Sequence, residues 1–105
     1  MVILQTTIQE ILAFRKERGW HTNQDARSLA ISISLEANEL LEPFQWVTGE
    51  VAQEKYRQEI KEEMADVLVY LVALADHMEI DLEKAISEKL IKNAIKYPVP
   101  EKTRV

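Results

Sequence analysis

The chain has 105 residues, of which 47% are hydrophobic and 30% are charged, with two glycines, three prolines and no cysteine. This composition is typical of one globular domain over residues 1–105, and its shortage of turn residues favours an all-α fold over a many-stranded sheet. The formal net charge of −5 argues against a protein that binds nucleic acid backbones nonspecifically. The lack of cysteine excludes disulfides, thiolate catalysis and sulfur-ligated metals.

The sequence predicts a cytoplasmic protein without a membrane segment. Met1–Leu4 is apolar, but polar residues follow at once and no basic segment precedes it, so no signal peptide is expected. The longest uncharged apolar run is Val67–Ala75, which is far shorter than the roughly 20 residues that span a bilayer.

Two amphipathic helices are predicted in the first half of the chain. Apolar residues recur at helical spacing over Thr6–Arg18. The polar segment Gly19–Gln24 is expected to end this helix and to form a loop. Asp25 is a suitable N-cap for a second helix over about Ala26–Glu42, which Pro43 should stop.

The second half is predicted to be helical after a short aromatic connector, Phe44–Gly49. Glu50–Met78 has a helical pattern that is charged at first and apolar later, with a break expected near Tyr56–Gln58. Asp81 can cap a last amphipathic helix, and an extended tail should begin at Pro98.

Two acidic pairs, Glu36-x-x-Glu39 and Glu63-x-x-Asp66, interrupt otherwise apolar helical stripes. Residues three apart share a helix face, so each pair should direct two carboxylates inward. Buried carboxylates are costly unless cations or donors satisfy them, and four of them imply bound metal. Carboxylate oxygens suit Mg²⁺, with Mn²⁺ as a substitute, and two divalent ions would offset a charge of about −4.

A simpler interpretation of either pair remains open, because Glu-x-x-Glu is common on solvated acidic helices. In that case the protein is a non-catalytic helical assembly module, whose acids pair with Lys or Arg of a partner.

Separated segments of the chain resemble one known family. The segments are Ser34–Trp46, Glu62–Ala75, Asp81–Leu82 and Lys89-x-x-x-Asn93-x-x-x-Tyr97-Pro98. In this order they resemble the MazG-like nucleotide pyrophosphohydrolases, and among these the dCTP pyrophosphatase group most closely. Leu35 and Asn38 depart from the family pattern, which often has Glu and Gly there.

The resemblance implies a four-helix MazG-like bundle that forms homodimers or homotetramers, with sites completed by neighbouring chains. It also implies an Mg²⁺-dependent enzyme that converts a (d)NTP and water to the (d)NMP and diphosphate. The expected substrate is a pyrimidine deoxynucleotide such as dCTP or a modified form, and the role is cleansing of the nucleotide pool. A related hydrolase of another phosphate anhydride, such as phosphoribosyl-ATP, is the alternative within this class.

By the same resemblance, Glu36, Glu39, Glu63 and Asp66 are the metal ligands. Either Glu36 or Glu39 is expected to accept the proton of the attacking water. No catalytic role is expected for the two histidines, since a lone histidine is more often a surface residue than a ligand.

Five further residues are expected to bind the substrate. The resemblance suggests that Trp20 and Trp46 line a nucleobase pocket, where a flat ring can stack on a base. Lys89, Asn93 and Tyr97 lie at intervals of one helical turn, so they can reach one ligand together. Lys supplies a point charge for phosphate, and Asn supplies a donor and an acceptor.

Overall fold

The computed structural model describes residues 2–100, and their side chains from residue 5 onward. Within that range the chain is helical and contains no strand, which confirms the predicted all-α class. The elements in chain order are α1 (Val2–Glu17), α2 (Ala26–Leu41), the short 3₁₀ helix η1 (Glu42–Phe44), α3 (Gly49–Lys55), α4 (Arg57–His77) and α5 (Leu82–Lys96).

Three helices begin at a side chain that satisfies free backbone N–H groups. Asp25 accepts a hydrogen bond from the N–H of Ser28 at 2.7 Å, and Asp81 accepts one from the N–H of Lys84 at 3.0 Å. Both N-caps were predicted from the sequence and are confirmed. Thr48 does the same for α3, as its hydroxyl accepts from the N–H of Val51 at 3.2 Å.

The long helical pattern after the connector is two helices rather than one. α3 and α4 are separated at Tyr56, whose φ of −115° and ψ of 27° lie outside the helical range. This is the predicted position of the break. The first helix starts earlier than expected, at Val2, and α2 ends at Leu41 because Pro43 is built into η1.

α1 ends in a Schellman motif centred on Gly19, whose φ of +70° is in the left-handed region. The N–H of Gly19 donates to the carbonyl of Lys16 at 3.1 Å, and the N–H of Trp20 donates to that of Arg15 at 3.0 Å. This turn brings Trp20 back onto Phe14, edge to face, with ring centroids 5.9 Å apart. The helix end therefore determines where Trp20 lies.

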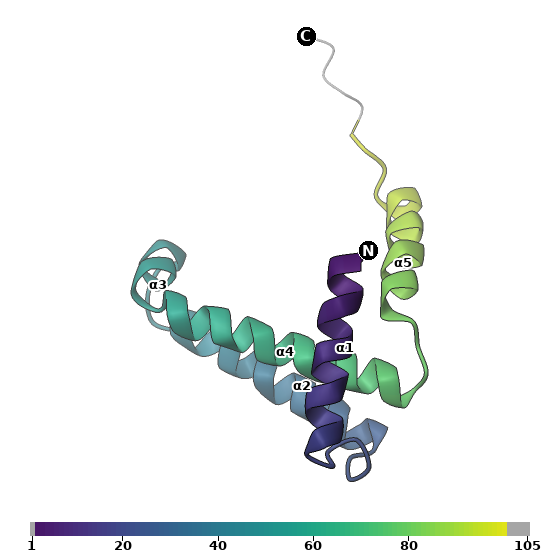
Figure 1. Ribbon diagram of the computed structural model, residues 1–105. Helices are drawn as coiled ribbons and strands as arrows, with labels where there is room; N and C mark the ends of the chain where they lie inside the picture. Colours follow the sequence, from purple (N-terminus) through teal and green to yellow (C-terminus); the bar gives the residue numbers. More distant parts are fainter. Residues whose placement is uncertain (1, 101–105) are drawn as a thin grey trace.

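The centre of the fold is the antiparallel pair α2 and α4, which α1 crosses near the C-terminal end of α4 (Figure 1). Leu29 of α2 is buried against this end of the pair, as are Val72, Ala73 and Ala75 of α4. The two alanines leave room for the helices to approach closely. α3 covers the far end of the pair, where Ala52 is fully buried.

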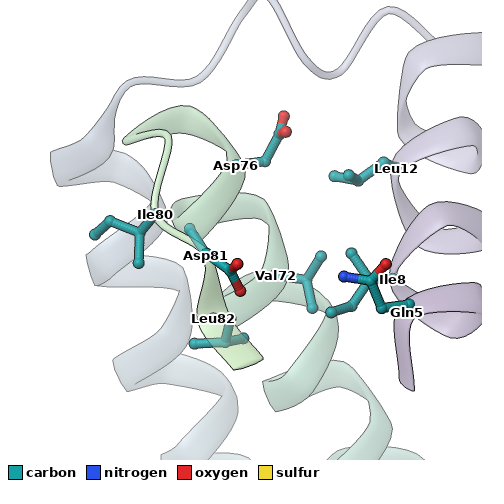
Figure 2. Close-up of a pocket in the computed structure, with 9 residues that line it drawn as sticks. Gln5, Ile8, Leu12, Val72, Asp76, Ile80, Asp81 and Leu82 are labelled. Carbon is teal, nitrogen blue, oxygen red and sulfur yellow. The ribbon is translucent and has the colours of Figure 1, made fainter. Parts of the chain in front are cut away.

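α5 stands away from this pair (Figure 1). Its apolar side chains are largely solvent-exposed, with Leu90 at 61%, Ile91 at 65% and Ile95 at 77%. A small cavity of about 140 Å³ lies where α1, the end of α4 and the start of α5 meet; it is lined by residues that include Ile8, Val72 and Leu82 (Figure 2). Ligand pockets are usually larger, about 300–1,000 Å³.

No helix within residues 2–100 has the length and apolar character to cross a membrane.

Candidate active site

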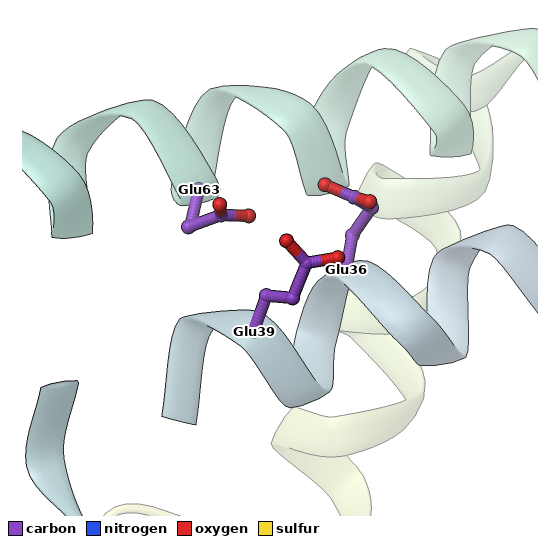
Figure 3. A group of neighbouring side chains, drawn as sticks. All are labelled: Glu36, Glu39 and Glu63. Atoms are coloured by element: carbon purple, nitrogen blue, oxygen red, sulfur yellow. The ribbon is translucent and has the colours of Figure 1, made fainter. Parts of the chain in front are cut away.

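The α2–α4 pair brings acidic residues from both helices together. Carboxylate oxygens of Glu36, Glu39 and Glu63 lie within 4.8 Å of one another. Glu36 and Glu39 point from α2 and Glu63 points from α4, so that the three carboxyl groups converge between the helices (Figure 3). We call these three residues the acidic cluster. Their spacing of one turn along α2 explains why both side chains of that helix face α4.

The electrostatics of the acidic cluster are unfavourable without a counter-charge. Burial is the largest cause of a raised pKa of Glu36, and together with the neighbouring charges of Glu39, Glu63 and Asp66 it brings this pKa to about 7. Burial also raises the pKa of Glu63, with Glu39 and Asp66 adding to the effect. A bound divalent cation would offset this unfavourable arrangement and favour the ionised carboxylates.

One oxygen of Glu63, Oε2, is buried and has no hydrogen-bond partner among the described residues. A buried acceptor without a partner is costly, and a bound cation would satisfy it. Three converging carboxylates supply the oxygen ligands that Mg²⁺ and Mn²⁺ accept. The residues present therefore fit a divalent metal.

Asp66 lies one turn after Glu63 on α4 but is not one of the three side chains that converge. Its charge raises the pKa of Glu36 and of Glu63, so it lies close enough to act on the cluster. Asp66 also lines a separate open cavity of about 550 Å³ between α1 and α4, which we call the aromatic cavity. Its lining residues are Thr7, Glu10, Ile11, Phe14, Arg15, Trp20, Asp66, Val69 and Tyr70.

The two tryptophans lie in different cavities of this chain. Trp20 lines the aromatic cavity next to Asp66. Trp46 is 89% exposed and lines an open cavity of about 360 Å³ that also includes Glu39 and Glu63. The acidic cluster thus lies between the two tryptophans, which do not share one pocket within a single chain.

Lys89 and Asn93 are on α5 and Tyr97 directly follows its last residue, and the three are not brought to the acidic cluster of the same chain. α5 follows the C-terminal end of α4, and about 21 Å of helix separates Glu63 from His77, the last residue of α4. The three residues do lie on consecutive turns, and the N–H of Tyr97 donates to the carbonyl of Asn93 at 2.7 Å.

Arg15 and Tyr70 belong to the aromatic cavity, and sequence reasoning did not single them out. Arg15 is 6% exposed, although it is a charged residue on an amphipathic helix. One signal was available: Arg15 follows Ile11 and Leu12 by one turn, which places it on the apolar face of α1. Tyr70 lies inside the uncharged run of α4, which on sequence alone indicates only a core position.

The chain is thus an all-helical protein whose central helix pair holds a cluster of carboxylates suited to a divalent cation. The sequence profile of the MazG-like family matches residues 31–105. The chain belongs to the MazG-like family.

The curated proteins similar in sequence to this chain include dCTP pyrophosphatase 1 from several mammals. The chain is 38% identical over 91 residues to dCTP pyrophosphatase 1 of Rattus norvegicus, covering 82% of this chain and 54% of that protein. It is 39% identical over 90 residues to dCTP pyrophosphatase 1 of Homo sapiens, covering 81% and 53%. The chain therefore spans about half the length of these relatives.

A solved structure shares both the fold and much of the sequence. The crystal structure of a pyrophosphatase from Archaeoglobus fulgidus superimposes with a TM-score of 0.80 at 40% identity, covering 91% of this chain and 93% of that one.

Proposed function

We propose that this protein is an Mg²⁺-dependent nucleoside triphosphate pyrophosphohydrolase that converts a (d)NTP and water to the (d)NMP and diphosphate. The proposed substrate is a pyrimidine deoxynucleotide such as dCTP or a modified form, and the proposed role is cleansing of the cytoplasmic nucleotide pool. The observation that carries this proposal is the convergence of Glu36, Glu39 and Glu63 around a buried oxygen without a partner. The names of the relatives support the reaction class.

Glu36, Glu39 and Glu63, together with Asp66, are the residues that would hold the metal. Bound divalent cations would supply counter-charge, hold phosphate oxygens and lower the pKa of a water molecule. The protein contributes fixed positions for the carboxylates, since they project from two helices that pack directly against each other.

One carboxylate of α2 would accept the proton of the attacking water. Glu36 and Glu39 are both candidates, because they are adjacent in the cluster and a carboxylate that is not fully occupied by metal can act as a base. No covalent intermediate is required. The remaining carboxylates would hold the water and the phosphorus in line. Positioning of this kind, with electrostatic stabilisation, provides most of the catalysis in phosphoryl transfer.

The aromatic cavity is the proposed position of the nucleobase. Its volume of about 550 Å³ is within the usual range for small-molecule sites. Trp20 and Tyr70 offer flat surfaces for stacking, and Asp66 connects the cavity to the acidic cluster, where the phosphates would lie. Trp46, on the other side of the cluster, would close the site from a second direction.

A second copy of the chain would complete the site as a homodimer or homotetramer. Lys89, Asn93 and Tyr97 are too far from the cluster of their own chain to contact its ligand. The exposed apolar side chains of α5 give that helix a surface for association, and a neighbouring chain could thereby place these three residues over the phosphates.

The reaction can be tested with purified protein, Mg²⁺ and a panel of common and modified triphosphates, with products identified by chromatography. We expect the monophosphate and diphosphate in a 1:1 ratio, and a loss of about 100-fold or more in Glu63→Gln. The matched control is Glu62→Gln, an exposed neighbour that accepts a hydrogen bond from Gln58 and lies outside the cluster. Failure to hydrolyse any triphosphate, with no effect of Mg²⁺ on melting, would favour the assembly module instead. Turnover of phosphoribosyl-ATP alone would favour the other hydrolase.

Sharing of the site between chains can be tested by mixing two inactive variants. Glu63→Gln lacks a metal ligand, and Lys89→Ala lacks the proposed phosphate contact. If neighbouring chains complete each site, a dimer that contains one chain of each variant has one intact site out of two. About half of the dimers in an equal mixture are of this kind, so the mixture regains up to about a quarter of the wild-type activity. A mixture as inactive as its components, in a protein that sediments as a monomer, would contradict the shared site.

A further inference from the structure

Arg15 is a buried cation with few partners. Its side chain is 6% exposed, and its Nη2 donates a hydrogen bond to Oε1 of Gln24. The guanidinium carbon lies 5.9 Å from the centroid of the Tyr70 ring. Within the described part of the chain, no carboxylate lies at ion-pair distance from Arg15, and Gln24 is its one side-chain hydrogen-bond acceptor. A guanidinium has five N–H groups, and no nitrogen of Arg15 is both fully buried and without a partner among the described residues, so the donors that Gln24 does not use reach open space.

Arg15 lines the aromatic cavity and also a smaller neighbouring cavity that includes Gln24. Tyr70 lines the aromatic cavity, and Arg15 is the one basic residue among its lining. Arg15 has N–H groups left over after its bond to Gln24, and a ligand in the aromatic cavity that carries acceptor atoms could receive them. The ligand is not expected to be a phosphate, because Glu10 and Asp66 place two carboxylates in the same cavity. An uncharged flat ring with acceptor atoms fits Arg15, Trp20 and Tyr70 together.

The chemistry of the donors then selects among nucleobases. A guanidinium only donates, and its planar fork suits two adjacent acceptors. Cytosine offers O2 and N3 next to each other. In uracil and thymine N3 carries a proton, and adenine has no two adjacent acceptors. We propose that Arg15 is a specificity-determining residue that donates to O2 and N3 of cytosine in the aromatic cavity; this inference rests on the function proposed above.

The first test is a calorimetric titration of the product monophosphates dCMP, dUMP, dAMP and dGMP, which needs no turnover. Wild-type protein should bind dCMP roughly 10- to 100-fold more tightly than dUMP or dAMP, the range for one bidentate contact. Arg15→Lys keeps the positive charge but loses the two parallel N–H donors of the guanidinium. This variant should therefore lose the preference for dCMP. Lys16→Ala, which removes an exposed charge from the same turn of α1, should preserve it. Guanine also has two adjacent acceptors, O6 and N7, so tighter binding of dGMP than of dCMP would overturn the assignment.

A change in the ligand tests the same contact without a change in the protein, in case Arg15→Lys does not fold. In 3-deaza-2′-deoxycytidine monophosphate a C–H group replaces N3. Wild-type protein should bind it about 10-fold more weakly than dCMP. Equal affinities would overturn the proposal.

The two proposals can fail separately. If wild-type protein hydrolyses triphosphates but Arg15→Lys weakens all four monophosphates equally, the reaction stands and the role of Arg15 is wrong. If no triphosphate is hydrolysed while the preference for dCMP depends on Arg15, the reaction is wrong and the recognition of cytosine holds.

Discussion

Glu36 on α2 and Glu63 on α4 hold carboxylate oxygens within 4.8 Å of each other across the interface of the two helices. Burial is the main cause that disfavours ionisation of both groups; the charges of Glu39 and Asp66 act on both in the same direction, whereas the hydrogen bond between Glu36 and Glu63 lowers the pKa of Glu63. The pKa of Glu36 is therefore about 7 and that of Glu63 is above its ordinary value. The stability of the metal-free protein should consequently depend on pH and on divalent cations.

The first prediction concerns pH. Folding raises the pKa of Glu36 from 4.5 to about 7, so the folded state binds the proton more tightly than the unfolded chain does. The contribution to stability is complete below pH 4.5 and is lost as the pH rises through about 7. In urea unfolding with a chelator, wild type should lose on the order of 1 kcal/mol relative to Glu36→Gln between pH 4.5 and 8, after allowance for solvent screening. A difference between the two proteins that does not change with pH would contradict this assignment.

The second prediction concerns metal binding. Mg²⁺ that binds only the folded state should stabilise wild type by about 2.7 kcal/mol at a concentration of 100 times its Kd, and raise the Tm accordingly. Glu63→Gln should lose most of this effect, because it removes a converging carboxylate. The rise in Tm is measured by thermal melts over a series of Mg²⁺ concentrations, with Glu62→Gln as the control. Equal Mg²⁺ responses in the two variants would show that the ion binds elsewhere.

The third prediction concerns the end of α1. Gly19 has a φ of +70° and no heavy atom within 4 Å of an added Cβ, so Gly19→Ala meets backbone strain without a steric clash. It should destabilise the protein by about 1 kcal/mol. Gly49 is equally open but lies at the start of α3, so Gly49→Ala should be neutral or stabilising by up to about 1 kcal/mol. In urea denaturation, the free energy of unfolding should fall in Gly19→Ala and should stay the same or rise in Gly49→Ala. A loss of equal size in both variants would argue against the left-handed turn at Gly19.

The fourth prediction concerns Glu79, a non-glycine residue with a φ of 55° just after α4. The N–H of Ile80 donates to the carbonyl of Ala75 at 2.8 Å, so this end has the same turn as the end of α1. Glu79→Gly should stabilise the protein by about 0.5 kcal/mol, since relief of strain exceeds the added chain entropy. Glu88→Gly, inside α5, should instead destabilise it by about 1 kcal/mol. Denaturation midpoints that shift in the same direction would contradict this explanation.

Features encoded within one or two turns could be predicted from the sequence. Asp25 and Asp81 cap helices through bonds to residues three positions ahead, and such contacts depend only on local spacing. The convergence of Glu36, Glu39 and Glu63 follows from helical periodicity once α2 and α4 are packed together. A break was also expected near Tyr56–Gln58, and α3 and α4 are separated at Tyr56.

Features that depend on the packing of distant segments could not be predicted in the same way. Nothing near Trp20 or Trp46 indicates that they lie in different cavities, because that depends on how α1 crosses α4. The contact of Arg15 with Tyr70 likewise depends on how α1 packs against α4. The separation of α5 from the central pair is also a tertiary property, which the amphipathic pattern of that helix does not determine.

Arg15 and Glu63 lie on different helices and line different cavities, with Asp66 as the residue that adjoins both regions. Base preference should therefore be open to redesign through α1 while the hydrolytic machinery of α2 and α4 is left intact. Asp66 is the position to avoid in such a design, because a substitution there would alter selectivity and turnover together.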